Sequence, residues 1–380
     1  MSFAAELHLP QDVIVRGGAS HEVGDAAAGL GLERVLIVTD PFFAEQGLAA
    51  AVAERLTAAG IVTETFAGVQ PDPTTANVEA GLEALHAHGA DGVVALGGGS
   101  SLDTGKAVAV MAANDGAVAD FVGYHQIPRP GLPLIAIPTT AGTGSEVTRV
   151  TVITDAESDR KLMILDDHLL PRVALADFEL TRSCPPDLTA HVGVDSLTHA
   201  IEAYVSAKAN PITDALALRA AELLQGHLRR AYHDGEDAEA REAMMLGATL
   251  AGAAFSNASV ALVHGMSRPI GAHFHIPHGL SNAVLLPTVT RFSLEGARPR
   301  YAELARAMGL GDDADALVDE LDALNAELGV PSLSGLGIER EHFDRVKADM
   351  AQAALDSGSP GFNPREAIAE EIVGLYDAIY

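Results

Sequence analysis

One aspartate and three histidines in the second half of the 380-residue chain have the chemistry of metal ligands. Asp195 and His199 are four residues apart in GVDSLTHAIEAY, so they share one face if this segment is a helix. His264 and His278 follow in VHGMSRPIGAHFHIPHGLSNAVLLP. A carboxylate with imidazoles, and no thiolate, suits a divalent ion such as Fe²⁺ or Zn²⁺.

The residues alone leave the ligand set open. His273 and His275 compete with His264 and His278 on spacing, and the chain has 15 histidines. An aspartate and a histidine four residues apart are also an ordinary pair on a helix surface. Histidines that bond to the backbone would need no ion.

A glycine-rich stretch in the first half, GGGSSLD at residues 97–103, follows an apolar run and opens a predicted helix. Glycines let backbone amides approach a phosphate, and a helix N-terminus adds partial positive charge, so the stretch suits a pyrophosphate. It does not match the Gly-x-Gly-x-x-Gly fingerprint, and close packing of a helix on a strand would need the same glycines.

A second loop, PTTAGTGSE at residues 138–146, also follows an apolar run and carries three threonine hydroxyls and one serine hydroxyl. Ligands of open α/β sheets bind at the carboxyl ends of the strands, where both loops are expected. Asp40 closes an earlier strand, where a carboxylate can accept hydrogen bonds from a ribose and would repel a 2′-phosphate. A helix cap is the alternative role for Asp40. Together these features predict a nucleotide site that prefers NAD(H).

Strand-like and helix-like segments alternate up to about Ser183. The strand-like runs cover residues 34–40, 61–66, 92–96 and 134–138, the helical segments cover 44–59, 75–88 and a stretch from about 101, and a hairpin is expected over 151–155 and 161–165. Apolar strands separated by helices are typical of a parallel sheet that is covered on both faces. We therefore predict an α/β, Rossmann-like dinucleotide-binding domain over residues 1–183.

Helical periodicity dominates after the break at Pro185-Pro186-Asp187. The clearest helical segments are 212–232, 238–255, 314–328, 341–354 and 364–380. An all-helical, metal-binding catalytic domain is therefore predicted over residues 184–380. The uncharged stretch 243–267 is long enough to suggest a membrane span, but its alanines, glycines and polar residues favour a buried pair of helices.

Composition restricts the partners and the compartment. Lys and Arg number 24 against 52 Asp and Glu, and no basic run offsets the net charge of −28, so a nucleic-acid partner is not expected. Cys184 is the only cysteine, which excludes an intramolecular disulfide and a cysteine-based metal site. The N-terminus lacks the pattern of a signal peptide. We predict a cytoplasmic protein without a membrane partner.

Four stretches carry a resemblance to a known family: GGGSSLDTGKAVA, PTTAGTGSEVT, GVDSLTHAIEAY and HGMSRPIGAHFHIPHGLSNAVLLP. In this order and spacing they resemble the iron-dependent (group III) alcohol dehydrogenase family, from about residue 15 to the C-terminus. The resemblance implies hydride transfer between NAD(H) and a small primary alcohol or aldehyde. It implies Fe²⁺, or sometimes Zn²⁺, held by Asp195, His199, His264 and His278, and a homo-oligomer such as a dimer.

The resemblance also implies a cofactor site, formed by Asp40, Asp72, Gly98, Gly99, Ser100, Asp103, Thr139, Thr140, Thr143, Lys161 and Leu180. Two positions depart from the family: Asp72 stands where many members have Asn, and Arg268 stands where many have a fourth His assigned to the nicotinamide side. The charged guanidinium of Arg268 indicates a substrate that bears an anionic group; a neighbouring acid or the cofactor pyrophosphate is the alternative partner.

Two other functions are compatible with the same residues. One is a zinc-dependent polyol dehydrogenase of the glycerol type. The other, from a different class, is a protein that binds a nucleotide without catalysis.

Overall fold

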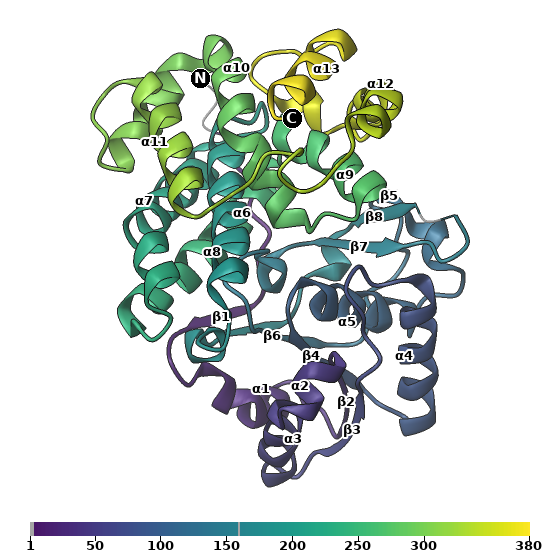
Figure 1. Cartoon of the computed structure of the whole chain (residues 1–380). Helices are drawn as coiled ribbons and strands as arrows, with labels where there is room; N and C mark the ends of the chain where they lie inside the picture. Colours follow the sequence, from purple (N-terminus) through teal and green to yellow (C-terminus); the bar gives the residue numbers. More distant parts are fainter. Residues whose placement is uncertain (1–3, 159) are drawn as a thin grey trace. The chain divides into compact units, whose positions relative to one another are not determined.

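The computed structural model describes residues 4–158 and 160–380 (Figure 1). These residues form two compact units: residues 8–183, and residues 184–380 together with residues 4–7. The first unit contains all the strands of the described chain, and the second is built of helices.

A six-stranded parallel sheet forms the centre of the first unit, with the strand order β1-β9-β6-β4-β2-β3. From β2 the chain adds β3 on one side, and then adds β4, β6 and β9 on the other. The order therefore reverses between β2 and β4, and open α/β sheets bind ligands at the carboxyl ends of the strands at such a point. The strands are β1 (Asp12–Val15), β2 (Arg34–Val38), β3 (Val62–Phe66), β4 (Gly92–Gly97), β6 (Leu134–Pro138) and β9 (Val173–Ala176).

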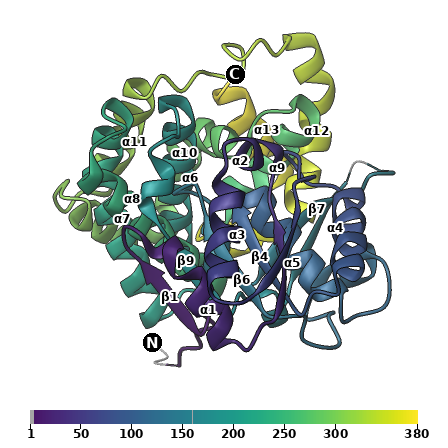
Figure 2. The same ribbon diagram turned by 90° about the horizontal axis from the view of Figure 1, so that it is seen from below.

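Successive residues of the central strands enter two different cores. In β2, Val35 and Ile37 pack with α1 (Val23–Gly29) and α3 (Leu48–Ala58). Leu36 and Val38 pack on the other face with α4 (Thr75–His88) and α5 (Gly99–Met111). Because both faces are buried, the strands have continuous apolar sequences rather than alternating ones. Figure 2 shows this unit from a second direction.

The expected hairpin is confirmed, since β7 (Val150–Thr154) pairs antiparallel with β8 (Lys161–Leu165). Strand β5 (Gly123–Tyr124) completes this smaller sheet. The single helix predicted over 44–59 is wrong. The chain forms α2 (Pro41–Glu45) and α3, separated at Gly47, whose φ of +81° is readily adopted only by glycine.

Eight α-helices form the second unit, and the described residues from 184 to 380 contain no strand, which confirms the all-helical prediction. The helix predicted over 364–380 begins later, at Ala369. The helices are α6 (Pro186–Val205), α7 (Pro211–His233), α8 (Ala238–Ala258), α9 (Leu262–Phe274), α10 (His278–Ala307), α11 (Ala314–Glu327), α12 (Arg340–Asp356) and α13 (Ala369–Ala378).

Glycines allow α6, α7 and α8 to approach closely. A Cβ added to Gly193 of α6 would lie 2.3 Å from Leu228 Cδ1 of α7, and one added to Gly247 of α8 would lie 2.8 Å from Leu224 Cγ. Most residues of α8 and of the first two turns of α9 are buried, as predicted for a helical pair. Across the described residues no single helix meets the criteria for a membrane span; α8 and α9 meet them only as a pair bent by 102°.

Candidate active site

The first two proposed metal ligands project from one face of α6. Asp195 and His199 are both buried, and Asp195 Oδ1 lies 3.9 Å from His199 Nε2. The ring of His199 stacks on Phe255 of α8, with the ring centroids 4.2 Å apart. Packing on α8 therefore holds this imidazole toward the aspartate.

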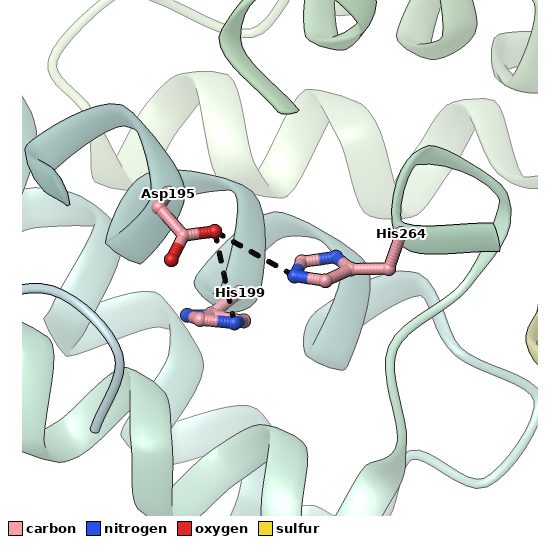
Figure 3. Close-up of side chains that lie close together, drawn as sticks. All are labelled: Asp195, His199 and His264. Atoms are coloured by element: carbon pink, nitrogen blue, oxygen red, sulfur yellow. Dashed lines mark ion pairs between the residues drawn. The ribbon is translucent and has the colours of Figure 1, made fainter. Parts of the chain in front are cut away.

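Helices α9 and α10 bring two further imidazoles to the same carboxylate oxygen. Figure 3 shows His264 of α9 pointing at Asp195, and its Nε2 lies 3.6 Å from Asp195 Oδ1. His278 is the first residue of α10, and its Nε2 lies 3.9 Å from the same oxygen. The side chain of His278 is 48% exposed, so the group is open to solvent on this side. The competing histidines, His273 and His275, lie exposed near the end of α9, outside this group.

Asp195, His199 and His264 could share one ion, since one ligand atom from each lies within 4.8 Å of the others; His278 approaches Asp195 but lies outside that group of three. Ligand atoms about 2.1 Å from an ion at tetrahedral positions lie about 3.4 Å from one another. The distances from Asp195 Oδ1 to the three imidazole nitrogens are 3.6–3.9 Å. One carboxylate oxygen and three imidazole nitrogens are a donor set that both Fe²⁺ and Zn²⁺ accept.

The charges at the site favour ionised Asp195. Burial by itself would raise the pKa of Asp195, but the imidazoles of His199, His278 and His264 outweigh this effect and hold the pKa below its ordinary value. Burial also opposes a charge on His264, yet Glu202 and Asp195 together raise the pKa of that imidazole. Asp195 is therefore an anion at neutral pH, as metal binding requires.

Two polar residues at this site were not identified from the sequence. Asn282 Nδ2 donates a 2.6 Å hydrogen bond to Asp195 Oδ1 and lies 3.2 Å from Nε2 of both His264 and His278. Glu202 accepts a hydrogen bond from His264 Nδ1. The sequence held a sign of both residues: each is a polar residue in an apolar helical stretch, and each lies one turn after a histidine of the group.

Asp40 lies at the point where the strand order of the sheet reverses. Its Oδ1 accepts the Phe43 N–H at 3.1 Å and so caps α2, which is the alternative role considered from the sequence. Its Oδ2 faces the glycine-rich loop, 3.4 Å from Ser101 Oγ. A Cβ added to Gly97 would lie 3.3 Å from the same oxygen. The carboxylate is thus beside the start of α5 as well as capping α2.

The two loops predicted to hold the cofactor face each other. A Cβ added to Gly99 would lie 2.9 Å from Thr143 Cγ2, and one added to Gly98 would lie 3.8 Å from Thr140. Gly98 is the N-cap of α5 and has no side chain to cover the first amides of that helix. A helix N-terminus of this kind suits a phosphate. Ser100 lies in its first turn, and Thr139 is buried directly after β6.

Four other predicted cofactor residues are engaged with the protein itself. Asp103 accepts hydrogen bonds from Ser145 Oγ at 2.8 Å and from the Val152 N–H at 2.9 Å, so it ties α5 to the second loop and to β7. Lys161 forms an ion pair with Asp72, which is itself one of the predicted residues. Leu180 packs against the apolar core on the α1 and α3 side of the sheet.

Arg268 lies one turn after His264 on α9, so the two residues share a helix face. Its guanidinium donates a 2.9 Å hydrogen bond to Ser359 Oγ.

Comparisons with known proteins cover nearly the whole chain. Residues 10–178 match the family model described as iron-containing alcohol dehydrogenase, and residues 189–380 match the model for the C-terminal part of the Fe-containing alcohol dehydrogenase family. Lactaldehyde reductase of Escherichia coli (strain K12) is 41% identical over 369 residues, 94% of this chain and 95% of that protein.

Solved structures show the same likeness. The structure of 1,3-propanediol oxidoreductase has a TM-score of 0.96 at 35% identity and covers 99% of this chain and 100% of its own. Sulfoacetaldehyde reductase of Bifidobacterium kashiwanohense, solved in complex with NAD⁺, has a TM-score of 0.90 at 32% identity and covers 100% of this chain and 99% of its own.

Gly279 offers a test of the site geometry. Its added Cβ would lie 2.5 Å from the carbonyl oxygen of His191 on α6, a backbone atom that cannot easily move. Gly279→Ala should therefore push the first turn of α10 away from α6 and carry His278 with it. We expect a loss of about 1–3 kcal/mol in the free energy of unfolding and at least tenfold weaker metal binding, measured by denaturant unfolding and by metal titration.

The matched control is Gly226→Ala in α7, where an added Cβ has nothing within 4 Å. This variant should keep its metal affinity and gain up to about 1 kcal/mol from the better helix propensity of alanine. Metal affinity in Gly279→Ala equal to that of the unmodified protein would contradict the proposed position of His278.

Proposed function

The chain belongs to the iron-containing alcohol dehydrogenase family, and from this premise we propose that it transfers a hydride between NAD(H) and a small primary alcohol or aldehyde. The proposal places a divalent ion on Asp195, His199, His264 and His278. The observation that carries it is the convergence of three imidazole nitrogens on one oxygen of a buried carboxylate.

A bound divalent ion would supply Lewis-acid chemistry toward the substrate oxygen, and a nicotinamide would supply or accept the hydride. The protein contributes position and charge. Asp195 provides a buried negative charge whose orientation is set by the Asn282 amide. His278, on the open side of the group, leaves room for a small substrate. This complete donor set argues against a protein that only binds a nucleotide.

In the sheet unit, the first amides of α5 and the glycines at 98 and 99 would hold the pyrophosphate. The hydroxyls of Thr140 and Thr143 lie on the facing loop. Asp40 would accept the ribose hydroxyls and repel the 2′-phosphate of NADP(H). Dimer formation and a cytoplasmic location stay predictions from the sequence.

We further propose that the preferred substrate carries an anionic group. The supporting observation is Arg268, a permanent cation one helical turn after His264 on α9. The similarity to sulfoacetaldehyde reductase, whose named substrate is anionic, supports the same conclusion.

Metal removal tests the main proposal. Protein treated with a chelator should lose NADH oxidation with short aldehydes, and added Fe²⁺ should restore it; a parallel arm with Zn²⁺ distinguishes iron use from the zinc polyol alternative. His264→Ala should lose the metal and the activity together. The proposal is wrong if His264→Ala retains one metal per chain and normal turnover.

Asp40→Gly tests cofactor choice. The unmodified enzyme should have a higher kcat/KM with NADH than with NADPH, and removal of the carboxylate should narrow this ratio at least tenfold, mainly by lowering the KM for NADPH. Glycine is chosen because it replaces an aspartate N-cap at a cost of only a few tenths of a kcal/mol, so α2 stays intact. Equal efficiency with both cofactors in the unmodified enzyme would refute the role of Asp40.

Arg268→Gln tests the anionic substrate. A hydrogen bond to a charged group contributes about 1.5–3 kcal/mol, or roughly ten- to a hundredfold in affinity. The variant should therefore lose about that much kcat/KM with succinic semialdehyde and much less with propanal. Equal losses on the two aldehydes, or a general preference of the unmodified enzyme for uncharged aldehydes, would count against an anion site at Arg268.

A further inference from the structure

A second buried carboxylate, Glu202, lies one turn after His199 on α6 and is only 3% exposed. Among the described residues, its hydrogen-bond donors come from Ala261, the N-cap of α9, and from Val263 and His264 in the first turn of that helix. Oε2 accepts the Ala261 N–H at 2.9 Å and contacts His264 Nδ1 at 2.6 Å, while Oε1 accepts the Val263 N–H at 2.6 Å. Its ion-pair partner among the described residues is thus a histidine rather than a lysine or an arginine.

The two backbone contacts fix the start of α9. Ala261 is the N-cap of this helix and offers no side-chain cap, so the first amides need an acceptor from elsewhere. Glu202 provides that acceptor from α6, and the partial positive charge at the helix N-terminus favours its negative charge. The position at which α9 begins determines where His264 projects.

The third contact determines which nitrogen of His264 carries the proton. An ionised carboxylate only accepts hydrogen bonds, so at 2.6 Å from Glu202 Oε2 the Nδ1 atom must be the donor. In the neutral ring Nε2 then keeps its lone pair, and this atom faces Asp195 Oδ1 at 3.6 Å. A metal ion binds the unprotonated nitrogen of a neutral imidazole.

The surroundings of Glu202 leave little room for water to solvate its carboxylate. Behind it lies a cavity of only about 10 Å³, lined in part by Val263, Tyr301 and Ser293. Such a volume holds one water at most. A buried carboxylate without its partners costs several kcal/mol, so the hydrogen bonds to the α9 segment are strongly maintained.

We propose that Glu202 is a positioning residue that holds His264 as its Nδ1–H tautomer and presents Nε2 to the metal ion, an inference that rests on the proposed metal site. It does not touch the ion or the substrate. Carboxylates that orient metal-binding histidines typically change metal affinity by 10- to 100-fold when they are removed.

Glu202→Gln is the sharpest test, because glutamine has the same shape. A neutral amide carbonyl is a weaker acceptor than a carboxylate, and an amide NH₂ at the Oε2 position would donate to His264 Nδ1 while facing the Ala261 N–H that Oε2 also accepts. Either orientation of the amide weakens the preference for the Nδ1–H form. We expect metal affinity to fall 10- to 100-fold, measured for Fe²⁺ and for Zn²⁺ by competition with a chelating dye. In the metal-free protein, at a pH high enough to leave His264 neutral, ¹⁵N NMR of the imidazoles should show the Nδ1–H form of His264 in the unmodified protein and a larger share of the Nε2–H form in the variant.

Two further variants separate orientation from general stability. Glu303→Gln removes another carboxylate that bonds to α6, through the hydroxyl of Tyr204, and should change neither the metal affinity nor the tautomer. Glu202→Asp keeps an anionic acceptor and should retain the Nδ1–H form with a smaller loss of affinity. It also provides the test if Glu202→Gln fails to fold.

The proposal is overturned if a folded Glu202→Gln protein binds metal as tightly as the unmodified one, or loses affinity while the tautomer of His264 stays the same. It is also overturned if Glu202→Asp loses the Nδ1–H form. If the unmodified protein binds neither Fe²⁺ nor Zn²⁺, the proposed function fails, whereas the NMR comparison still decides the role of Glu202.

Discussion

Burial of the Asp195 carboxylate is the constraint on which the helical unit depends. An isolated charge in such an interior costs several kcal/mol, so its partners must be held close. They come from three separate helices: His199 from α6, His264 from α9, and His278 with Asn282 from α10. Those helices can meet around one oxygen only where small residues permit it, as Gly279 does against the backbone of α6.

In the sheet unit, the residues near the carboxyl ends of β4 and β6 have two different roles. Glycines and threonines at the carboxyl ends of β4 and β6 would contact a phosphate. Asp103 instead supports the loops, because its two carboxylate oxygens accept hydrogen bonds from Ser145 Oγ and from the Val152 N–H. Lys106 supports the same region from inside, donating to Thr148 Oγ1 and to the Val150 carbonyl at 2.9 Å each. Burial lowers the pKa of this lysine to about 8, despite the nearby Asp103 and Glu146.

Most elements of the fold could be predicted because their signals are local. The central strands are buried on both faces and therefore have uninterrupted apolar sequences, and long helices have a clear period. The elements that could not be predicted also have local reasons for this. Strands β1 and β9 have four residues each, too few for a pattern, and β1 is partly exposed. The break at Gly47 lies within an alanine-rich run whose composition suits a continuous helix.

The sequence by itself determined the chemistry: a carboxylate and imidazoles without thiolates, and a shared helix face for Asp195 and His199, because both follow from residue type and the helical period. Only the tertiary structure shows which of the histidines meet the aspartate. His264 and His278 converge on Asp195 while His273 and His275 do not, because the packing of α9 and α10 on α6 determines which side chains meet. Glu202 and Asn282 became evident for the same reason, since His264 lies 62 residues from Glu202 and Asp195 lies 87 residues from Asn282 in the chain.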